Sequence, residues 1–556
     1  MDVTRLFEVT ELLDHVYEFL EPSWHFALAR TCKSIYYRSD RVLSKHRAAY
    51  KDSRIASDRY PQTLLRLFHS ASCTVGPDAI EAWHVRELEI WGSRRSWDEW
   101  RSWELSPSGT VSLTHDQVAL SLPFAIGELE YHLERLESVM SGVQHDIACQ
   151  RVRDGEDGFF KMVLISLLPR LKALKFVERP HDGHTSFTWL KTAIGWSLRN
   201  RTPWPPGFLS LRNVAVGVPT VAAQAGSDGI SARVDGLAKL LRLPNIVEVY
   251  YRNLEMEYHP ELEYLDTSSA FYDLPPGSSS VKTIILDRIR GDSLVFREVL
   301  CAAPAALESM IIRGEADTQT ESDQIAGYLT ESTSSASIKS FLYYNPELVL
   351  ASHLVICKPM KLKQMANLRI VSICVQDIIN QASGNLGFPE THIQATHDDV
   401  VREFKTGLPR SIEAVAFCGL EYLIGLGEEK IHVTDIVDDG IVGMLESGNY
   451  PKLKMVFVDG IERFLAKKNP KGYFQKAIEA GAQHGVHIHT MTSKDGPEEM
   501  LDFPSLPDRH DLKSALLPKR DPSWFVNSFT GEWTAPYTSN ADDVYDFSEF
   551  ADTVIL

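Results

Sequence analysis

A six-residue pattern, apolar-x-x-apolar-x-apolar, recurs after residue 170 and constrains the fold of this 556-residue chain more than any other feature. Successive copies stand about 35 residues apart, a spacing typical of an internal structural repeat. Alternation of apolar residues predicts a β-strand in each copy. The copies are LKALKF, LRNVAV, IVEVYY, VKTIIL, LESMII, IKSFLY, LRIVSI, IEAVAF and LKMVFV, beginning at residues 171, 211, 246, 281, 307, 338, 368, 412 and 453. A weaker strand, VHIH, begins at residue 486.

Helix-like apolar runs lie between the copies, as in VDGLAKLLRLPN. Pro169, Pro244 and Pro451 stand shortly before a copy, where each would end the preceding helix. This alternation predicts parallel strands joined by helical crossovers, and therefore an α/β fold. Because so many strands exceed what most open sheets hold, we expect them to stack as a curved solenoid. The spacing resembles that of irregular leucine-rich repeats, although no Asn or Cys consistently follows the strand.

The chain is too long for one compact core, so we expect several domains. Residues 1–45 are predicted to form a short all-α module, and residues 46–160 a helical, Trp-rich connecting region with at least one strand. Residues 161–495 hold the α/β repeats. Residues 496–556 are acidic and rich in Pro, and we expect them to be partly disordered.

The connecting region carries two further signals. Apolar residues at helical spacing continue from about residue 38 to residue 70, with Ile55 among those expected to face inward. The stretch AWHVRELEIWGSRRSWDEWRSW, residues 82–103, combines one predicted strand with Trp at positions 91, 97, 100 and 103. Such a Trp cluster can stack on a ligand or pack between domains, and packing is the commoner role.

Charge and cysteine usage limit the class of protein. The chain has 57 Lys and Arg against 75 Asp and Glu, a net charge of −18, which argues against nucleic-acid binding. Residues 30–59 nevertheless carry a local excess of six positive charges, interpreted as a solvated helix face or as a contact with an acidic partner or with the acidic tail of the chain. Seven Cys without a C-x-x-C pair indicate a reducing compartment. No apolar run is long enough to span a membrane, so we expect a cytoplasmic or nuclear protein.

No catalytic, metal or cofactor motif is present. The sequence lacks G-x-x-x-x-G-K-[ST], G-x-S-x-G, H-E-x-x-H and any Cys/His set with zinc spacing. Three histidine pairs, His181/His184, His392/His397 and His487/His489, would each need further ligands to hold a metal. We therefore predict no catalytic residue, no bound metal and no cofactor, and we expect a binding protein rather than an enzyme.

The strand pattern also predicts a binding face. Residues that flank the apolar positions alternate to the opposite side of each strand, which is the concave side of a solenoid. That side mixes aromatic, aliphatic and charged residues, a composition typical of a protein-binding surface or of a face covered by another segment of the chain. The predicted substrate-binding residues are Tyr250, Arg252, Ile285, Asp287, Ile311, Arg313, Leu342, Tyr344, Phe457 and Asp459.

The N-terminal stretch TELLDHVYEFLEPSWHFALARTCK, residues 10–33, resembles an F-box. The family motif has Glu, Leu, Leu and spaced apolar residues in its first helix, then a Pro-containing turn and a Leu-Ala-x-x-Cys-Lys segment. Here the matching residues are Glu11, Leu12, Leu13, Val16, Phe19, Leu20, Pro22, Phe26, Leu28, Ala29, Thr31, Cys32 and Lys33. The Leu-Pro that opens the motif is replaced by Glu8-Val9, and the Trp after Cys-Lys by Ile35.

With the repeats that follow, the whole chain resembles the large F-box family of filamentous fungi. The resemblance implies the substrate-recognition subunit of a cullin-RING ubiquitin ligase, which binds a Skp-type adaptor through its F-box and an unknown protein substrate through its repeats. It implies adaptor contacts at Leu12, Leu13, Val16, Phe19, Leu20, Pro22, Phe26, Leu28 and Cys32. The alternative is an interaction scaffold whose first helices only cap the solenoid, because the end of a repeat array needs a polar cover.

Overall fold

The computed structural model divides the chain into two units, Met1–Ser493 with His510–Leu512, and Lys494–Arg509 with Lys513–Leu556. It describes residues 10–105, 111–114, 142–177, 185–200, 203–218, 232–256, 274–291, 296–318, 322–344, 359–382, 396–418, 430–458, 474–490, 525–526 and 533–534. In the second unit these are two short antiparallel strands, β16 (Phe525–Val526) and β17 (Trp533–Thr534). The remainder of the predicted disordered tail lies outside the described residues.

Four helices open the first unit: α2 (Thr10–Glu18), α3 (Pro22–Ala29), α4 (Lys33–Arg38) and α5 (Asp40–Asp52). Pro22 occupies the first turn of α3, where the missing N–H leaves no helical hydrogen bond unmade. We call α2–α5 the N-terminal helical cluster. Its small core is shared with α7 (Ile80–His84) and consists of Leu13, Tyr17, Ile35, Val42, Ala49 and Ile80. The cluster therefore extends beyond the boundary expected at residue 45.

Helix was predicted throughout residues 38–70, but the structure interrupts it. Strand β1 (Ile55–Ser57) follows α5, and helix α6 (Pro61–Ser72) comes after it. Ile55, expected to face inward, is 58% exposed. Residues 55–57 pair with residues 87–89 of β2 (Glu87–Ile90), so a strand distant in sequence decides their conformation.

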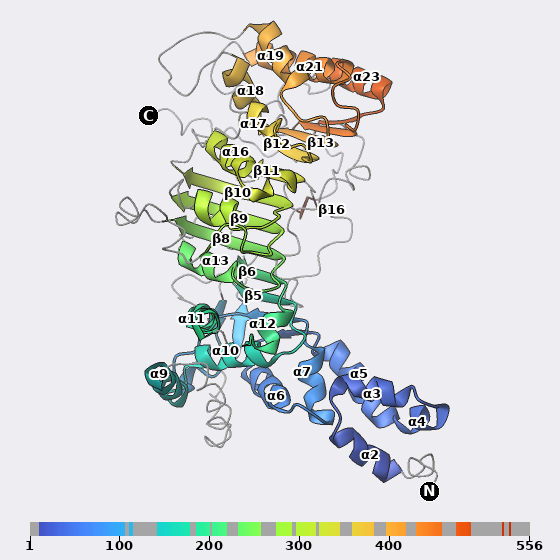
Figure 1. The fold of residues 1–556 in the computed structure, drawn as a ribbon, viewed down its shortest axis with the longest axis vertical. Helices are drawn as coiled ribbons and strands as arrows, with labels where there is room; N and C mark the ends of the chain where they lie inside the picture. The colour runs from blue at the N-terminus through green and yellow to red at the C-terminus, as the bar shows by residue number, and fades with distance from the viewer. Residues whose placement is uncertain are drawn as a thin grey trace, which may run out of the picture. The chain divides into compact units, whose positions relative to one another are not determined.

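One large sheet dominates the first unit (Figure 1). Twelve strands lie side by side in chain order and every neighbouring pair is parallel, while β7 (Ala232–Arg233) pairs with β8 beside this path. All strands predicted from the six-residue pattern are confirmed. After β1 and β2 they are β5 (Ala173–Val177), β6 (Asn213–Val218), β8 (Glu248–Met256), β9 (Thr283–Gly291), β10 (Ser309–Thr318), β11 (Ser340–Tyr344), β12 (Ile370–Cys374), β13 (Ala414–Cys418), β14 (Met455–Val458) and β15 (His487–Thr490).

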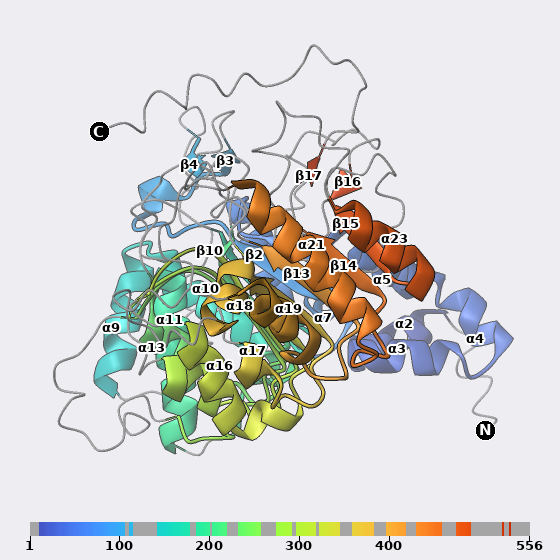
Figure 2. The same ribbon diagram turned by 90° about the horizontal axis from the view of Figure 1, so that it is seen from above.

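Helical crossovers join these strands and lie along one face of the sheet, as Figures 1 and 2 show. The first, fourth and sixth residues of a copy point into the core beneath them, as Leu171, Leu174 and Phe176 do. The fold is therefore α/β with a parallel sheet, as predicted. The crossover elements are α9 (Gly142–Arg153), α10 (Asp157–Leu167), α11 (Thr185–Asn200), α12 (Pro206–Ser210), α13 (Val234–Leu240), η4 (Phe296–Ala302), α16 (Ser322–Glu331), η5 (Thr333–Ala336), α17 (Pro359–Leu362), α18 (Val375–Ala382), α19 (His397–Thr406), α21 (Lys430–Glu446) and α23 (Gln475–His484).

Four small elements complete the described part of the connecting region. The 3-10 turns η1 (Pro77–Ala79) and η2 (Trp97–Glu99) flank β2, and β3 (Trp103–Leu105) pairs antiparallel with β4 (Val111–Leu113).

Side-chain hydrogen bonds tie adjacent repeats together just before the strands. Ser210, Ser280, Ser337 and Ser411 each precede the first residue of a copy. Each donates to the carbonyl oxygen of the first residue of the previous copy, at 2.9, 2.8, 2.7 and 2.6 Å. Asn245 and Asn367 stand at the same place and donate to the carbonyls of Leu209 and Ala336. These side chains give backbone carbonyl groups of one copy a hydrogen-bond donor from the next copy.

Candidate interaction surfaces

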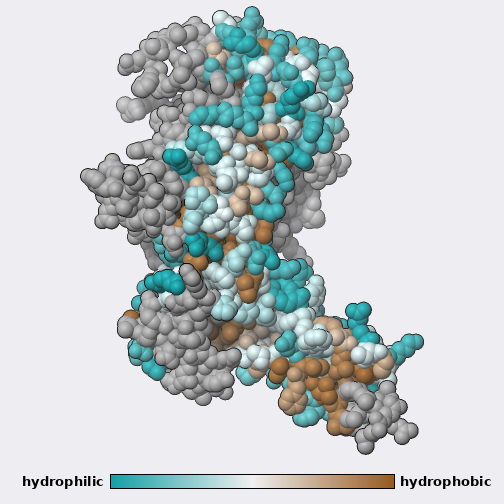
Figure 3. Space-filling model, in the orientation of Figure 1, coloured by the Kyte–Doolittle hydropathy of each residue, from teal (hydrophilic) through white to brown (hydrophobic). Residues whose placement is uncertain are grey.

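The N-terminal helical cluster leaves several large apolar side chains exposed. Phe19 is 69% exposed, Trp24 59%, Leu12 42% and Phe26 37%. We call these four residues, from α2, α3 and the turn between them, the N-terminal apolar surface. Figure 3 shows hydrophobic residues gathered over this part of the molecule. Burying such side chains against a partner would stabilise a complex by about 1.5–3 kcal/mol each.

The other predicted adaptor-contact residues divide by burial. Leu13 and Pro22 are buried inside the cluster, so they hold its helices together and present no surface to a partner. Val16, Leu20 and Leu28 are half-buried, and Leu20 and Leu28 pack against the small core. Cys32 is exposed before α4.

Three buried histidines form a continuous chain through the helical cluster. His25 Nδ1 lies 3.0 Å from His46 Nε2, and His46 Nδ1 lies 2.9 Å from His84 Nε2. His25 Nε2 donates to the carbonyl oxygens of Leu20 and Tyr17 at 3.1 and 3.3 Å. Its Nδ1 must therefore accept the proton of His46 Nε2, and His46 Nδ1 in turn accepts from His84. The hydrogen bonds are satisfied when all three rings are neutral and protonated on Nε2.

The environment of this chain favours the neutral rings. Burial lowers the pKa of His25. Burial, with the neighbouring rings His25 and His84, lowers the pKa of His46 to about 3. Burial and the positive charges of Arg86 and Arg170 lower the pKa of His84 to about 4. The chain therefore links α3, α5 and α7 without carrying charge at neutral pH.

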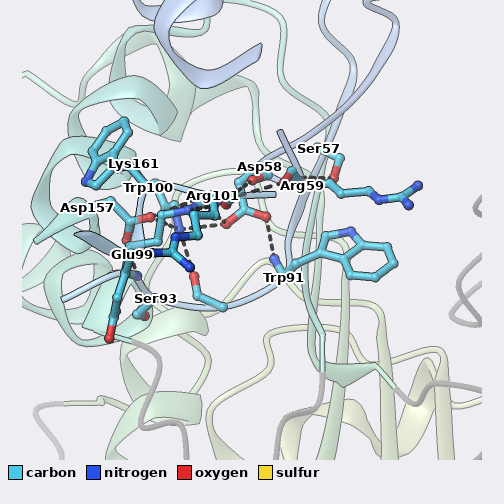
Figure 4. A network of polar contacts seen from close by, with 12 residues as sticks. Ser57, Asp58, Arg59, Trp91, Ser93, Glu99, Trp100, Arg101, Asp157 and Lys161 are labelled. Atoms are coloured by element: carbon cyan, nitrogen blue, oxygen red, sulfur yellow. Dashed lines mark hydrogen bonds and ion pairs between the residues drawn. The ribbon is translucent and has the colours of Figure 1, made fainter. Parts of the chain in front are cut away.

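A second buried polar group lies where β1, β2 and α10 meet (Figure 4). Lys161 Nζ lies 2.6 Å from Asp58 Oδ2 and 2.7 Å from Asp157 Oδ2. Arg94 Nη1 lies 3.0 Å from the same oxygen of Asp157. All four side chains are completely buried. We call Asp58, Arg94, Asp157 and Lys161 the buried ion cluster, in which two positive and two negative groups balance.

Hydrogen bonds to the backbone complete the cluster. Asp58 accepts from the backbone N–H of Trp91 at 2.6 Å, and Lys161 donates to the carbonyl of Gly92 at 2.7 Å. Arg94 donates to the carbonyls of Asp58 and Arg101. Because solvent does not reach these groups, the cluster is a structural link between the first strands and α10 and not a binding site.

The four Trp residues of the connecting region serve packing. Trp91, Trp100 and Trp103 are at most 2% exposed, and Trp97 stacks on Trp100 with ring centroids 4.9 Å apart. The guanidinium carbon of Arg94 lies over the Trp103 ring, 4.9 Å from the centroid of that ring. Of the two roles that the sequence allowed, packing is the one that the structure shows.

The residues predicted to bind substrate share one face of the sheet, but that face is not open. In register, Tyr250 lies beside Ile285, Ile285 beside Ile311 and Ile311 beside Leu342. With Phe457 of β14, these residues are at most 7% exposed. Their burial agrees with the alternative that the face is covered and differs from an accessible substrate surface. The side chains of Arg313 and Tyr344, and the whole of Asp459, lie outside the described residues.

The polar members of this face bind one another. Tyr250 donates a hydrogen bond to Asp287 Oδ2 at 2.7 Å, and Arg252 Nε lies 3.9 Å from the same oxygen. Arg252 and Asp287 are both about 95% buried, so this triad contributes to the interior of the protein in the structure described.

The histidine pairs of the sequence do not converge on a metal site within the described part of the chain, where no group of three His, Cys, Asp or Glu side chains has that geometry. His397 lies 3.1 Å from Asp439, and His487 is exposed on β15. His181, His184 and His392 lie outside the described residues. None of the helices in the described ranges is both long and apolar enough to cross a membrane.

Comparison with known protein families yields no matching family model, and no curated protein is significantly similar in sequence.

Proposed function

We propose that the protein is the substrate-recognition subunit of a cullin-RING ubiquitin ligase and that its N-terminal helical cluster docks on a Skp-type adaptor. The observation that carries the proposal is the exposure of Leu12, Phe19, Trp24 and Phe26 in the segment with the F-box-like motif. Large apolar side chains grouped at a surface mark a site of association. Apolar anchors on short helices fit a helix-in-groove contact.

Burial divides the motif into two roles. Leu13 and Pro22 are interior residues that fix α2 and α3, whereas Leu12, Phe19 and Phe26 are available for contact. Trp24 stands outside the apolar positions of the motif but adds the largest exposed aromatic ring of this segment.

The sheet serves the same proposal as the substrate-binding body. Parallel strands in chain order, helices on one face and recurring Ser or Asn bonds between copies support an irregular leucine-rich-repeat-like solenoid. Such a body would hold a protein substrate near the ubiquitin-loaded enzyme and raise its effective concentration. The chain itself would perform no covalent step.

The alternative is a scaffold in which the helices only cap the first strands. The shared core with Ile80 of α7 favours it, since α7 leads directly into β2. A cap, however, needs a polar outer face, and the aromatic residues exposed on this one are a liability unless a partner covers them.

Co-purification of the full-length chain with a Skp-type adaptor tests the proposal. The wild-type protein should retain the adaptor, and the double variant Phe19→Asp, Trp24→Asp should lose it without a change in unfolding midpoint. Ile147→Asp on α9 is the matched control, because Ile147 is 46% exposed but lies outside the N-terminal apolar surface. Failure of the folded wild-type chain to bind, or equal binding by the double variant, would overturn adaptor docking and leave the scaffold.

A further inference from the structure

The residues that immediately precede the strands form a continuous row across the sheet. Each carbonyl in this row accepts hydrogen bonds from the next segment: Arg86 O, for example, accepts from Lys172 N at 2.8 Å and from Ala173 N at 2.9 Å. Adjacent members stand about 4.8 Å apart, the spacing of neighbouring strands. In order, the row is Arg54, Arg86, Lys172, Arg212, Val247, Lys282, Glu308, Lys339, Arg369, Glu413 and Lys454.

Acidic residues interrupt the second half of this row. Glu308 lies between Lys282 and Lys339, with ion pairs of 2.8 and 2.6 Å. Hydrogen bonds from both lysines lower the pKa of the Glu308 carboxyl. Glu413 lies in the same way between Arg369 and Lys454, at 3.6 and 3.2 Å. Because each acid pairs with two cations, this half of the row has a lower density of positive charge than the first half, and its cations already have carboxylate partners.

The first half is entirely basic. Arg54, Arg86, Lys172 and Arg212 follow one another without an acid, and Arg170 lies close to Arg86. Within the described residues, none of these five forms an ion pair with a carboxylate. Burial, together with Arg170 and Arg54, lowers the pKa of the Arg86 guanidinium to about 10. The protein thus holds like charges close together, and a bound anion would reduce their mutual repulsion. We call Arg54, Arg86, Arg170, Lys172 and Arg212 the basic strip.

Aromatic rings and carbonyls fix the strip in place. The Arg170 guanidinium lies 3.8 Å from the centroid of the Trp83 ring and that of Arg86 lies 5.6 Å from it. Arg86 Nη1 also donates to the carbonyl oxygens of Trp83 and Val85, at 2.8 and 2.9 Å. Cations held over an aromatic face lose little freedom when a ligand binds.

The strip is accessible. Arg54, Lys172 and Arg212 are exposed. Arg86 and Arg170, whose guanidiniums lie over the Trp83 ring, are half-buried. Four strands span about 14 Å, which matches four or five residues of an extended peptide. A nucleic acid would need a longer basic track, and the net charge of −18 would repel it.

We propose that the basic strip binds an acidic, Asp- and Glu-rich segment of a protein partner. Arginine forks match carboxylates in a bidentate manner, and the acidic residues in the second half of the row limit the segment to the first four strands. The proposal is independent of adaptor docking, because no residue of the strip belongs to the N-terminal apolar surface.

Fluorescence anisotropy with the full-length chain and a labelled Glu-rich peptide tests the proposal. The wild-type protein should bind at low ionic strength, and added salt should weaken the complex. Arg86→Gln with Arg170→Gln should weaken binding about tenfold or more. If Arg86→Gln with Arg170→Gln affects folding, the variant Lys172→Glu with Arg212→Glu, which changes two exposed residues, should weaken peptide binding to the same degree.

The control is Lys282→Gln with Lys339→Gln, which removes two cations from the second half of the row and should change the affinity less than about twofold. The proposal is overturned if this control weakens binding as much as the strip variants. It is also overturned if a Gln-rich peptide of equal length binds as well as the acidic one, or if a single-stranded RNA binds more tightly through the same residues.

Discussion

The N-terminal helical cluster and the parallel sheet use their apolar residues in opposite ways. The cluster has a core of six residues and leaves Phe19 and Trp24 more than half exposed. In the central part of the sheet, large side chains on both faces are buried, as Tyr250 and Tyr251 on opposite faces of β8 show. The sheet therefore uses its apolar surface to fold, while the cluster keeps part of it for association.

Polar interiors follow the same division. The sheet begins at a buried ion cluster of four charged groups, whereas the helical cluster is held by three neutral histidines. A buried charge destabilises the fold unless all of its partners are present. The hydrogen bonds of buried neutral histidine rings are instead lost when low pH protonates the rings. The two regions should thus fail under different perturbations.

The largest effect is expected from Lys161→Met, which leaves two buried carboxylates with Arg94 alone. Removal of one partner of a buried ionic group costs about 3–5 kcal/mol in free energy of unfolding. Urea unfolding measures this loss. Lys282→Met removes an exposed partner of Glu308 and should cost about 1 kcal/mol or less. Equal costs for the two Lys→Met variants would contradict the structural role of the buried ion cluster.

Two residues only six positions apart, Leu13 in α2 and Phe19 in the turn after it, should differ sharply in their effect on stability. Leu13→Ala removes a fully buried side chain and should lower the free energy of unfolding of the helical cluster by about 2–5 kcal/mol. Phe19→Ala removes a side chain that is 69% exposed and should change it by about 0.5 kcal/mol or less. Hydrogen exchange of α2 and α3 amides gives both values. A large loss in Phe19→Ala would show that this ring belongs to the core.

Acid should open the helical cluster before the sheet. Histidines whose folded pKa is lowered contribute full stability above the unfolded pKa of about 6.5 and lose it as the pH falls below that value. His46 and His84 have folded pKa values of about 3 and about 4, so the loss continues toward pH 4. Each of these two histidines should lower the free energy of unfolding by about 1.4 kcal/mol for each pH unit in this range.

Hydrogen exchange of α3 and α5 between about pH 7 and 5.5, where carboxylates titrate little, measures this slope. His46→Gln should flatten it, and His15→Gln should not, since His15 is exposed on α2. A slope that is the same in the wild type and His46→Gln would remove the histidine chain as its cause.

Much of the sheet could be predicted because its pattern is local. Leu171, Leu174 and Phe176 form one inward set within six residues, and the same pattern located β6 and the strands from β8 to β15. The Ser and Asn bonds between copies left a readable signal as well, one residue before the first apolar position at Ser210, Asn245 and Ser280. That signal was missed because the usual tie follows the strand.

What could not be predicted depends on contacts between distant segments. Strand β1 exists because β2 pairs with it, and Asp58 meets Lys161 across more than a hundred residues. Apolar spacing also could not separate Leu12 from Leu13, since adjacent residues of a short, largely apolar helix face different sides and only packing determines which side is inside. The same limit applies to Tyr250, for which the sequence left both a binding face and a covered face open, and which the structure shows to be buried.

Hydrogen–deuterium exchange of the full-length chain with and without a Skp-type adaptor is a direct test of adaptor docking. We expect slower exchange in α2, α3 and α4 on addition of the adaptor, and unchanged exchange in β8 to β13. Unchanged exchange in the helices, or protection confined to the sheet, would contradict the claim that the helical cluster reserves its apolar surface for an adaptor.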